Sequence, residues 1–87
     1  MPLQAVPCIY YSLPLGTVEW FDKFGKKVGS DGRRRHMDDP QNQLHIESIM
    51  LHDEGIYVCR VTNRVGISTY DIRIHVLSEY SIALYRL

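Results

Sequence analysis

The sequence predicts an all-β domain that folds as a sandwich of two antiparallel sheets. In residues 17–22 and again in residues 69–76, apolar side chains alternate with polar ones, which is typical of strands that bury one face. Turn-forming residues separate these segments from the other apolar segments. The length of 87 residues, of which 45% are hydrophobic and 23% charged, suits one domain with a single core.

The N-terminal half is expected to form two strands followed by looser structure. The first strand should cover residues 3–10, and the Leu-Pro-Leu-Gly segment that follows should end it with a turn. The second strand, residues 17–22, places Trp20 on its buried face. Residues 23–43 contain glycines, a proline and charges of both signs, so they predict hairpin ends and edge strands rather than core.

The C-terminal half has stronger strand patterns. Leu44, Ile46 and Ile49 are expected to point inward, and residues 50–55 should turn the chain toward the opposite sheet. Two alternating segments then follow, joined by a short hairpin loop at residues 63–66.

The last of these strands has two different faces. Ile72 and Ile74 share an apolar face, whereas Asp71, Arg73 and His75 share the opposite, polar one. The polar face is therefore expected to meet solvent or a partner. Sandwich domains also bind through the loops at their ends, so both the polar face and the end loops are candidate binding sites.

A set of residues spread along the chain carries a family resemblance. These residues are Cys8, Trp20, Leu44, Ile46, Ile49, Asp53, Gly55, Tyr57, Cys59, Asn63 and Gly66. In order and spacing they resemble the immunoglobulin superfamily, and in particular its I-set type. The resemblance covers about residues 4–77 and implies an immunoglobulin-like β-sandwich, which is a scaffold for binding rather than for catalysis.

The resemblance assigns a role to the two cysteines. It implies that Cys8 and Cys59 form a disulfide between the sheets and that Trp20 packs against it. A bridge that closes a loop of 51 positions would stabilise the domain by roughly 4 kcal/mol. The alternative is a buried reduced pair, as in intracellular relatives.

The implied structural core consists of Trp20, Leu44, Ile46, Asp53, Gly55 and Tyr57. The Tyr57 hydroxyl should bond back to the main chain just upstream, in a tyrosine corner. Gly55 should stand where backbone crowding excludes a side chain. Asp53 should cap its turn and pair with an arginine at the base of the sandwich, for which the candidates are Arg33, Arg34 and Arg35.

The same three arginines have two further interpretations. Their guanidinium groups would suit a sulfated glycan or a phosphate, or they form a solvated edge that Asp38 and Asp39 neutralise. The candidate partner-binding residues are Arg33, Arg34, Arg35, Asp71, Arg73 and His75.

Both ends of the chain depart from the family pattern. The family's first strand is expected to be missing or reduced, and a strand-forming tail follows its usual stop at about Leu77. We therefore expect a domain at residues 1–77 and a C-terminal extension or linker at residues 78–87. Residues 82–87 are expected to fold back on the last strand or to pair with a second copy at a sheet edge, and a linker to a neighbouring domain is the alternative.

The sequence contains no pattern of catalytic, metal-binding or cofactor-binding residues, so neither an enzyme nor a metal or other cofactor is expected. Its histidines are scattered, and its glycines match no phosphate-binding loop. Ten basic and ten acidic side chains cancel, which argues against nucleic acid as a partner. No apolar stretch approaches the length that spans a bilayer.

The resemblance implies a non-catalytic protein-interaction module of a cell-surface or secreted protein, with a role in cell adhesion, guidance or ligand recognition by a receptor. Its partner would be a protein, and a homodimer is one possibility. The alternative is an intracellular structural or scaffold domain of a giant muscle or cytoskeletal protein. The cysteine pair favours the first, whereas the lack of a glycosylation sequon at Asn42 or Asn63 favours the second.

Overall fold

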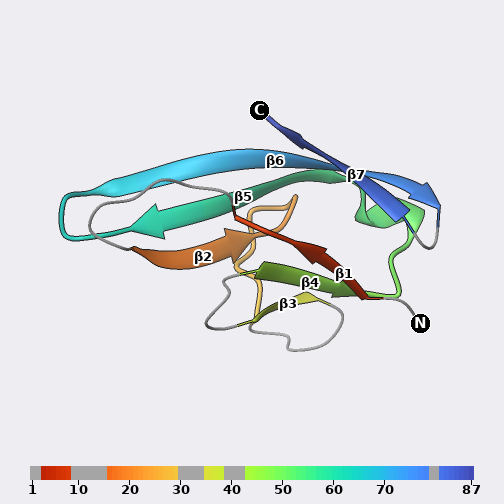
Figure 1. Ribbon diagram of the computed structural model, residues 1–87, viewed down its shortest axis with the longest axis horizontal. Coiled ribbons are helices and arrows are strands. Elements are labelled where there is room, and N and C mark those ends of the chain that lie inside the picture. Colours follow the sequence, from red (N-terminus) through yellow and green to blue (C-terminus); the bar gives the residue numbers. More distant parts are fainter. Residues whose placement is uncertain (1–2, 9–15, 30–34, 39–42, 79–80) are drawn as a thin grey trace.

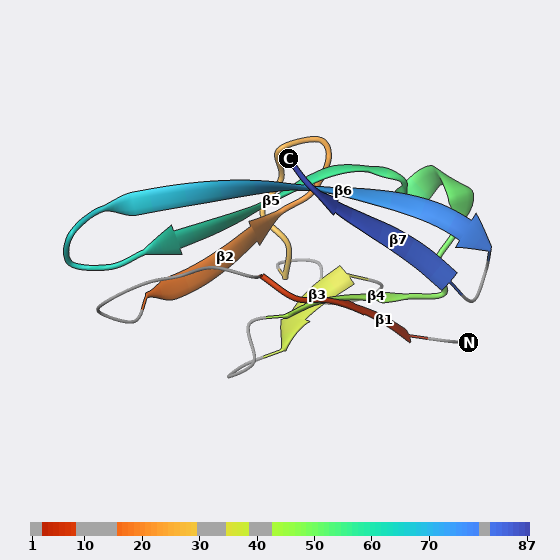
Figure 2. The same ribbon diagram turned by 45° about the horizontal axis from the view of Figure 1, so that its top comes forward.

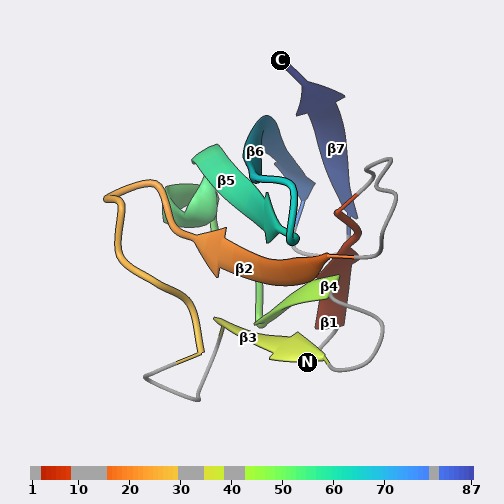
Figure 3. The ribbon, with the colours of Figure 1, turned by 90° about the vertical axis from the view of Figure 1, so that its left-hand side faces the viewer.

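The computed structural model describes residues 3–8, 16–29, 35–38, 43–78 and 81–87, and these residues form two antiparallel sheets (Figure 1). The strands are β1 (Leu3–Val6), β2 (Thr17–Phe21), β3 (Arg35–Asp38), β4 (Gln43–Glu47), β5 (Gly55–Thr62), β6 (Ile67–Ser78) and β7 (Ser81–Arg86), and a 3₁₀ turn, η1 (Leu51–Asp53), precedes β5. One sheet has the strand order β1–β4–β3 and the other β2–β5–β6–β7. The two sheets lie as the two layers of a sandwich (Figure 3). The predicted β-sandwich is confirmed.

The core lies between the sheets and follows from the alternation of side chains along the strands. Val18 and Trp20 are the buried positions of β2, and Leu44 and Ile46 are those of β4. Trp20, Leu44 and Ile46 have no exposed surface. Buried residues of both sheets form one cluster of Val6, Val18, Trp20, Val28, Leu44, Ile46, Ile49, Tyr57, Cys59, Val61, Ile72 and Ile74. Each large apolar side chain buried in this way stabilises the fold by about 1.5–3 kcal/mol.

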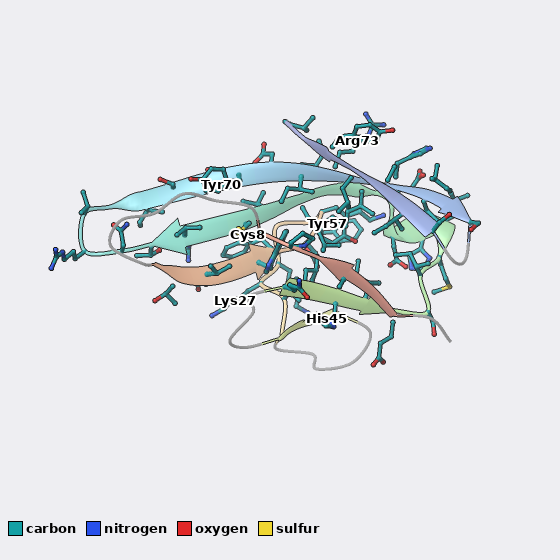
Figure 4. The ribbon with its side chains drawn as sticks, in the orientation of Figure 1. Cys8, Lys27, His45, Tyr57, Tyr70 and Arg73 are labelled. Carbon is teal, nitrogen blue, oxygen red and sulfur yellow. A yellow bond between two sulfur atoms is a disulfide. The ribbon has the colours of Figure 1, made fainter. Side chains whose placement is uncertain are left out.

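A disulfide between Cys8 and Cys59 crosses the core, with the Cα atoms 6.1 Å apart. It joins the chain just after β1, in the three-stranded sheet, to β5 in the four-stranded sheet (Figure 4). Trp20 lies opposite Cys59 across β2 and β5, and Tyr70 lies opposite Cys59 across β5 and β6. The disulfide that the family resemblance implied is therefore present, and aromatic residues flank it on both neighbouring strands.

The first strand is shorter than the predicted residues 3–10, because β1 ends at Val6. Pro7 follows it and has no backbone N–H with which to continue a ladder. Cys8 is half-buried beyond the end of the strand, and the rest of the predicted strand lies outside the described residues.

The C-terminal segment forms β7, the fourth strand of its sheet. It pairs antiparallel with the second half of β6 (Figure 2). Ile74 lies opposite Leu84 in this pairing, and Ile82 packs against the core. The tail is thus strand-forming and folds back on β6 within one chain. The division of the chain at Leu77 stays a prediction, since β6 itself continues to Ser78.

Candidate functional site

The candidate site is the face of the four-stranded sheet that points away from the core, and we call it the outer face. Because side chains alternate along a strand, the neighbours of each buried residue point to this side. Its residues are Thr17, Glu19 and Phe21 of β2, Ile56, Val58, Arg60 and Thr62 of β5, and Ile67, Thr69, Asp71, Arg73 and His75 of β6. Tyr85, which lies opposite Arg73, continues this face onto β7.

An ion cluster covers the β2 side of the outer face. Arg60 Nε and Nη2 donate to Glu19 Oε1 at 3.0 and 2.7 Å, and Lys27 Nζ lies 3.1 Å from Glu19 Oε2. The guanidinium carbon of Arg60 lies 4.8 Å from the centre of the Phe21 ring, a cation–π contact. The hydrogen bonds from Arg60 and then from Lys27 lower the pKa of the Glu19 carboxyl.

The lowered pKa keeps Glu19 ionised to a more acidic pH than an ordinary glutamate. A carboxyl whose pKa is lower in the folded state contributes stability above its ordinary pKa, and this contribution is lost as the pH falls through the lowered value. The Lys27 side chain is 59% exposed and that of Arg60 38% exposed, so solvent screens both pairs. We therefore expect the cluster to fix side-chain directions more than to stabilise the domain.

The β7 side of the outer face is open and of mixed character. Arg73, His75, Tyr85 and Leu87 border a shallow hollow of about 400 Å³. Tyr85 is 53% exposed and Leu87 66% exposed. Arg73 points away from the three-stranded sheet (Figure 4), and within the described part of the chain no carboxylate pairs with it. The Arg73 guanidinium is thus available to a partner.

His75 is held by the turn that precedes β5. Its Nδ1 lies 2.8 Å from Glu54 Oε1, and the same carboxylate oxygen accepts the Val76 N–H at 2.9 Å. Glu54 therefore links this turn to β6 and sets the direction of the His75 side chain at the border of the hollow.

The turn itself is fixed by residues that the family resemblance singled out. The Tyr57 hydroxyl donates to the Asp53 carbonyl oxygen at 2.8 Å, and Asp53 Oδ2 accepts the Met50 N–H at 2.8 Å. Both side chains are fully buried. Gly55 has a φ of 153°, and a Cβ there would lie 2.9 Å from Lys23 Cβ, so this position requires glycine.

For half of the predicted partner-binding residues, the structure does not describe the side chain. Arg33 and Arg34 lie outside the described residues, and Arg35 begins β3 with its side chain not described. The triple-arginine site and the pairing of an arginine with Asp53 therefore stay predictions. The remaining candidates lie together on the exposed side of β6: Asp71, Arg73 and His75.

The described residues contain no group of three or more His, Cys, Asp or Glu side chains that could hold a metal ion. In the same residues, no helix is both long and apolar enough to cross a bilayer.

Neither the ion cluster nor the place of Tyr85 on the outer face was predicted from the sequence. Glu19 and Arg60 lie opposite one another on paired strands but 41 positions apart in the chain. A signal existed, because placing Trp20 opposite Cys59 in antiparallel strands also places Glu19 opposite Arg60. Residues 82–87 were expected to fold back on the last strand, but no register was predicted for them, so the place of Tyr85 opposite Arg73 did not follow from the sequence.

Fold and side chains together define a class of protein. A sandwich joined by a disulfide, a tryptophan opposite the buried cysteine, and a tyrosine bonded back to the main chain are features of an immunoglobulin domain. Residues 6–76 match the model of the immunoglobulin I-set domain. The chain belongs to this family, and the resemblance seen in the sequence is confirmed.

The chain is similar to parts of longer proteins. It is 28% identical to contactin rig-6 of Caenorhabditis elegans over 78 residues, which are 90% of this chain and 6% of that protein. It is 37% identical to hemolin of Manduca sexta over 62 residues, or 68% of this chain and 15% of hemolin. The crystal structure of neural ectodermal development factor IMP-L2 matches with a TM-score of 0.69 and 28% identity, over 79% of this chain and 32% of that one. The chain thus spans a small part of the length of these relatives.

Proposed function

We propose that this domain is a protein-binding module of a cell-surface or secreted protein, and that its partner contacts the β7 side of the outer face. The observation that carries the proposal is the composition of this surface, where Arg73 and His75 stand beside the exposed Tyr85 and Leu87. Tyrosine and arginine are among the side chains enriched in the energetic centres of protein interfaces.

The partner chemistry follows from these side chains. The Arg73 guanidinium can donate two parallel hydrogen bonds to a carboxylate of the partner. Burial of Tyr85 and Leu87 would remove apolar surface from water next to that contact. A partner segment with an acidic side chain beside an apolar one therefore fits this surface.

An extracellular location is part of the proposal, and the Cys8–Cys59 disulfide supports it because such bonds persist in oxidising compartments. From membership of the I-set family we propose a role in cell adhesion, guidance or ligand recognition by a receptor. Similarity to a contactin is consistent with this choice. A spacer domain inside a muscle or cytoskeletal protein is the competing function.

Thiol alkylation of the protein from its native source separates these two locations. If alkylating reagent is added before lysis and the protein is then denatured, Cys8 and Cys59 should remain unmodified until a reductant is supplied. Mass spectrometry of the peptides measures the modification. Alkylation of both cysteines without reductant would favour the intracellular spacer.

Binding can be tested with the domain displayed in many copies on beads, against a panel of secreted and cell-surface ectodomains. Arg73→Glu and Tyr85→Ala should each weaken binding to the identified partner by at least about tenfold. Arg64→Glu, in the exposed loop between β5 and β6, is the matched control and should leave affinity unchanged. If Arg64→Glu weakens binding and Arg73→Glu does not, the partner binds at the end loops and the proposed face is wrong.

A further inference from the structure

The free edge of β7 presents main-chain groups with a defined pattern. β7 is the last strand in the order β2–β5–β6–β7, and no other described strand pairs with its second edge. The Leu87 N–H donates to the Asp71 carbonyl oxygen at 2.9 Å, on the β6 side. Because alternate residues of an antiparallel strand point to the same neighbour, Ala83 and Tyr85 also point to β6. The N–H and C=O groups at the free edge are therefore those of Ile82, Leu84 and Arg86.

This edge has few of the features that block pairing with another strand. Edge strands are commonly protected by prolines, lysines, bulges or inward-pointing charges. Between Ser81 and Arg86 the chain has no proline, glycine, lysine or acidic residue, and its one charged residue, Arg86, lies opposite Ile72 at the end of the strand. The pairing of β6 with β7 contains one register shift, between Val76 and Ser78. At the opposite edge of the sheet, the end of β2 pairs with the segment that follows it, through a bridge between Phe21 and Lys27.

Both faces of β7 offer apolar surface to an added strand. Leu84 lies opposite Ile74 on the core side and is 40% exposed, whereas Tyr85 lies on the outer face and is 53% exposed. A strand placed at this edge would cover surface on both sides and satisfy the free main-chain groups at the same time. The partner required by this geometry is a β-strand with small and apolar side chains.

We propose that this partner is β7 of a second copy of the chain, joined antiparallel about a two-fold axis at Leu84. In this register Leu84 lies opposite Leu84 of the second copy, and Ile82 lies opposite Arg86 of the second copy. Each of these residues has its N–H and C=O groups at the free edge, so the opposite residues can exchange main-chain hydrogen bonds. Ala83 faces Tyr85, which sets a small side chain beside a large one on the outer face.

Charge favours the antiparallel arrangement. It places the two Arg86 positions at opposite ends of the paired strands, whereas a parallel arrangement would set these positions side by side. On the core side, Ile74 and Leu84 of one copy continue into Leu84 and Ile74 of the other as one apolar row. The result is one continuous sheet across two copies, and it does not depend on which partner the outer face binds.

Cysteine cross-linking of the purified chain tests this register. Residues opposite one another in an antiparallel pair have Cα atoms about 4.5–5.5 Å apart, which is within the range of Cα separations found for disulfides. Leu84→Cys should therefore give a covalent dimer under mild oxidation, seen on a non-reducing gel. Tyr85→Cys and Ala83→Cys, each alone, should stay monomeric, whereas a mixture of these two variants should cross-link.

The second test measures association of the unmodified chain by sedimentation equilibrium over a range of concentrations. Leu84→Lys places two like charges opposite one another and should raise the dimer Kd at least about tenfold. Ile56→Lys is the matched control, because Ile56 is 46% exposed on β5, away from the edge, and it should leave the Kd unchanged. The far-ultraviolet circular dichroism of both variants should match that of the unmodified chain.

Three results would overturn the proposal. If the chain is monomeric at all concentrations and Leu84→Cys gives no cross-link, β7 does not pair with a second copy. The strand that pairs with this edge would then come from another protein. A dimer that Leu84→Lys does not weaken has its interface elsewhere. Cross-linking of Tyr85→Cys chains to one another, in place of Leu84→Cys chains, excludes the register.

Discussion

Replacing Cys8 and Cys59 together with alanine is expected to lower the free energy of unfolding by roughly 4 kcal/mol. The bridge closes a loop of sequence separation 51, and without it the unfolded chain gains conformations that the cross-link excludes. Cys59 is also fully buried, so its truncation removes packing around Trp20. Because small domains have a total stability of about 5–15 kcal/mol, this loss is a large share of the whole.

Equilibrium unfolding in urea, with and without reductant, measures the effect. Reduction of the unmodified chain removes the bridge and keeps both sulfur atoms, so it should account for most of the loss. The double alanine variant should not respond to reductant at all. If the oxidised and reduced forms of the unmodified chain unfolded at the same urea concentration, the bridge would not contribute to stability.

Much of the fold could be predicted because alternation of side chains is a local property of a strand. Val18 and Trp20, or Leu44 and Ile46, are two positions apart, so each pair shares one face whatever the rest of the chain does. Burial of these four residues therefore follows from short stretches of sequence. The length of the first strand did not follow, because Pro7 ends the ladder inside a segment that otherwise has the composition of a strand.

The candidate site was harder to predict, because it depends on which strands become neighbours. The exposure of Arg73 and His75 could be predicted from β6 alone, since the intervening residue is buried. The hollow beside them exists only because β7 pairs with β6, and this pairing brings Tyr85 next to Arg73. Short-range patterns specify the direction of a side chain, but the register between distant strands specifies which side chains gather into a surface.

Trp20→Ala is expected to destabilise the domain by about 3–5 kcal/mol, in the range found for large aromatic residues truncated in a core. Trp20 has no exposed surface and lies opposite Cys59, so its removal leaves a cavity beside the disulfide. The disulfide keeps the two sheets tethered, which limits how far they can close over that cavity. Calorimetry should show a fall in Tm of about 12 °C or more, since each kcal/mol corresponds to about 4–8 °C in a domain of this size.

The matched control for this substitution is Thr17→Ala, in the same strand but exposed on the outer face. It should change the free energy of unfolding by less than about 0.5 kcal/mol, because exposed positions contribute little packing. Trp20→Phe should fall between the two, since a smaller ring fills part of the cavity. Trp20, Cys59 and Tyr70 lie side by side on three neighbouring strands. If Trp20→Ala and Thr17→Ala were equally stable, this row would not be the centre of the core. Other contacts between the sheets would then stabilise the sandwich.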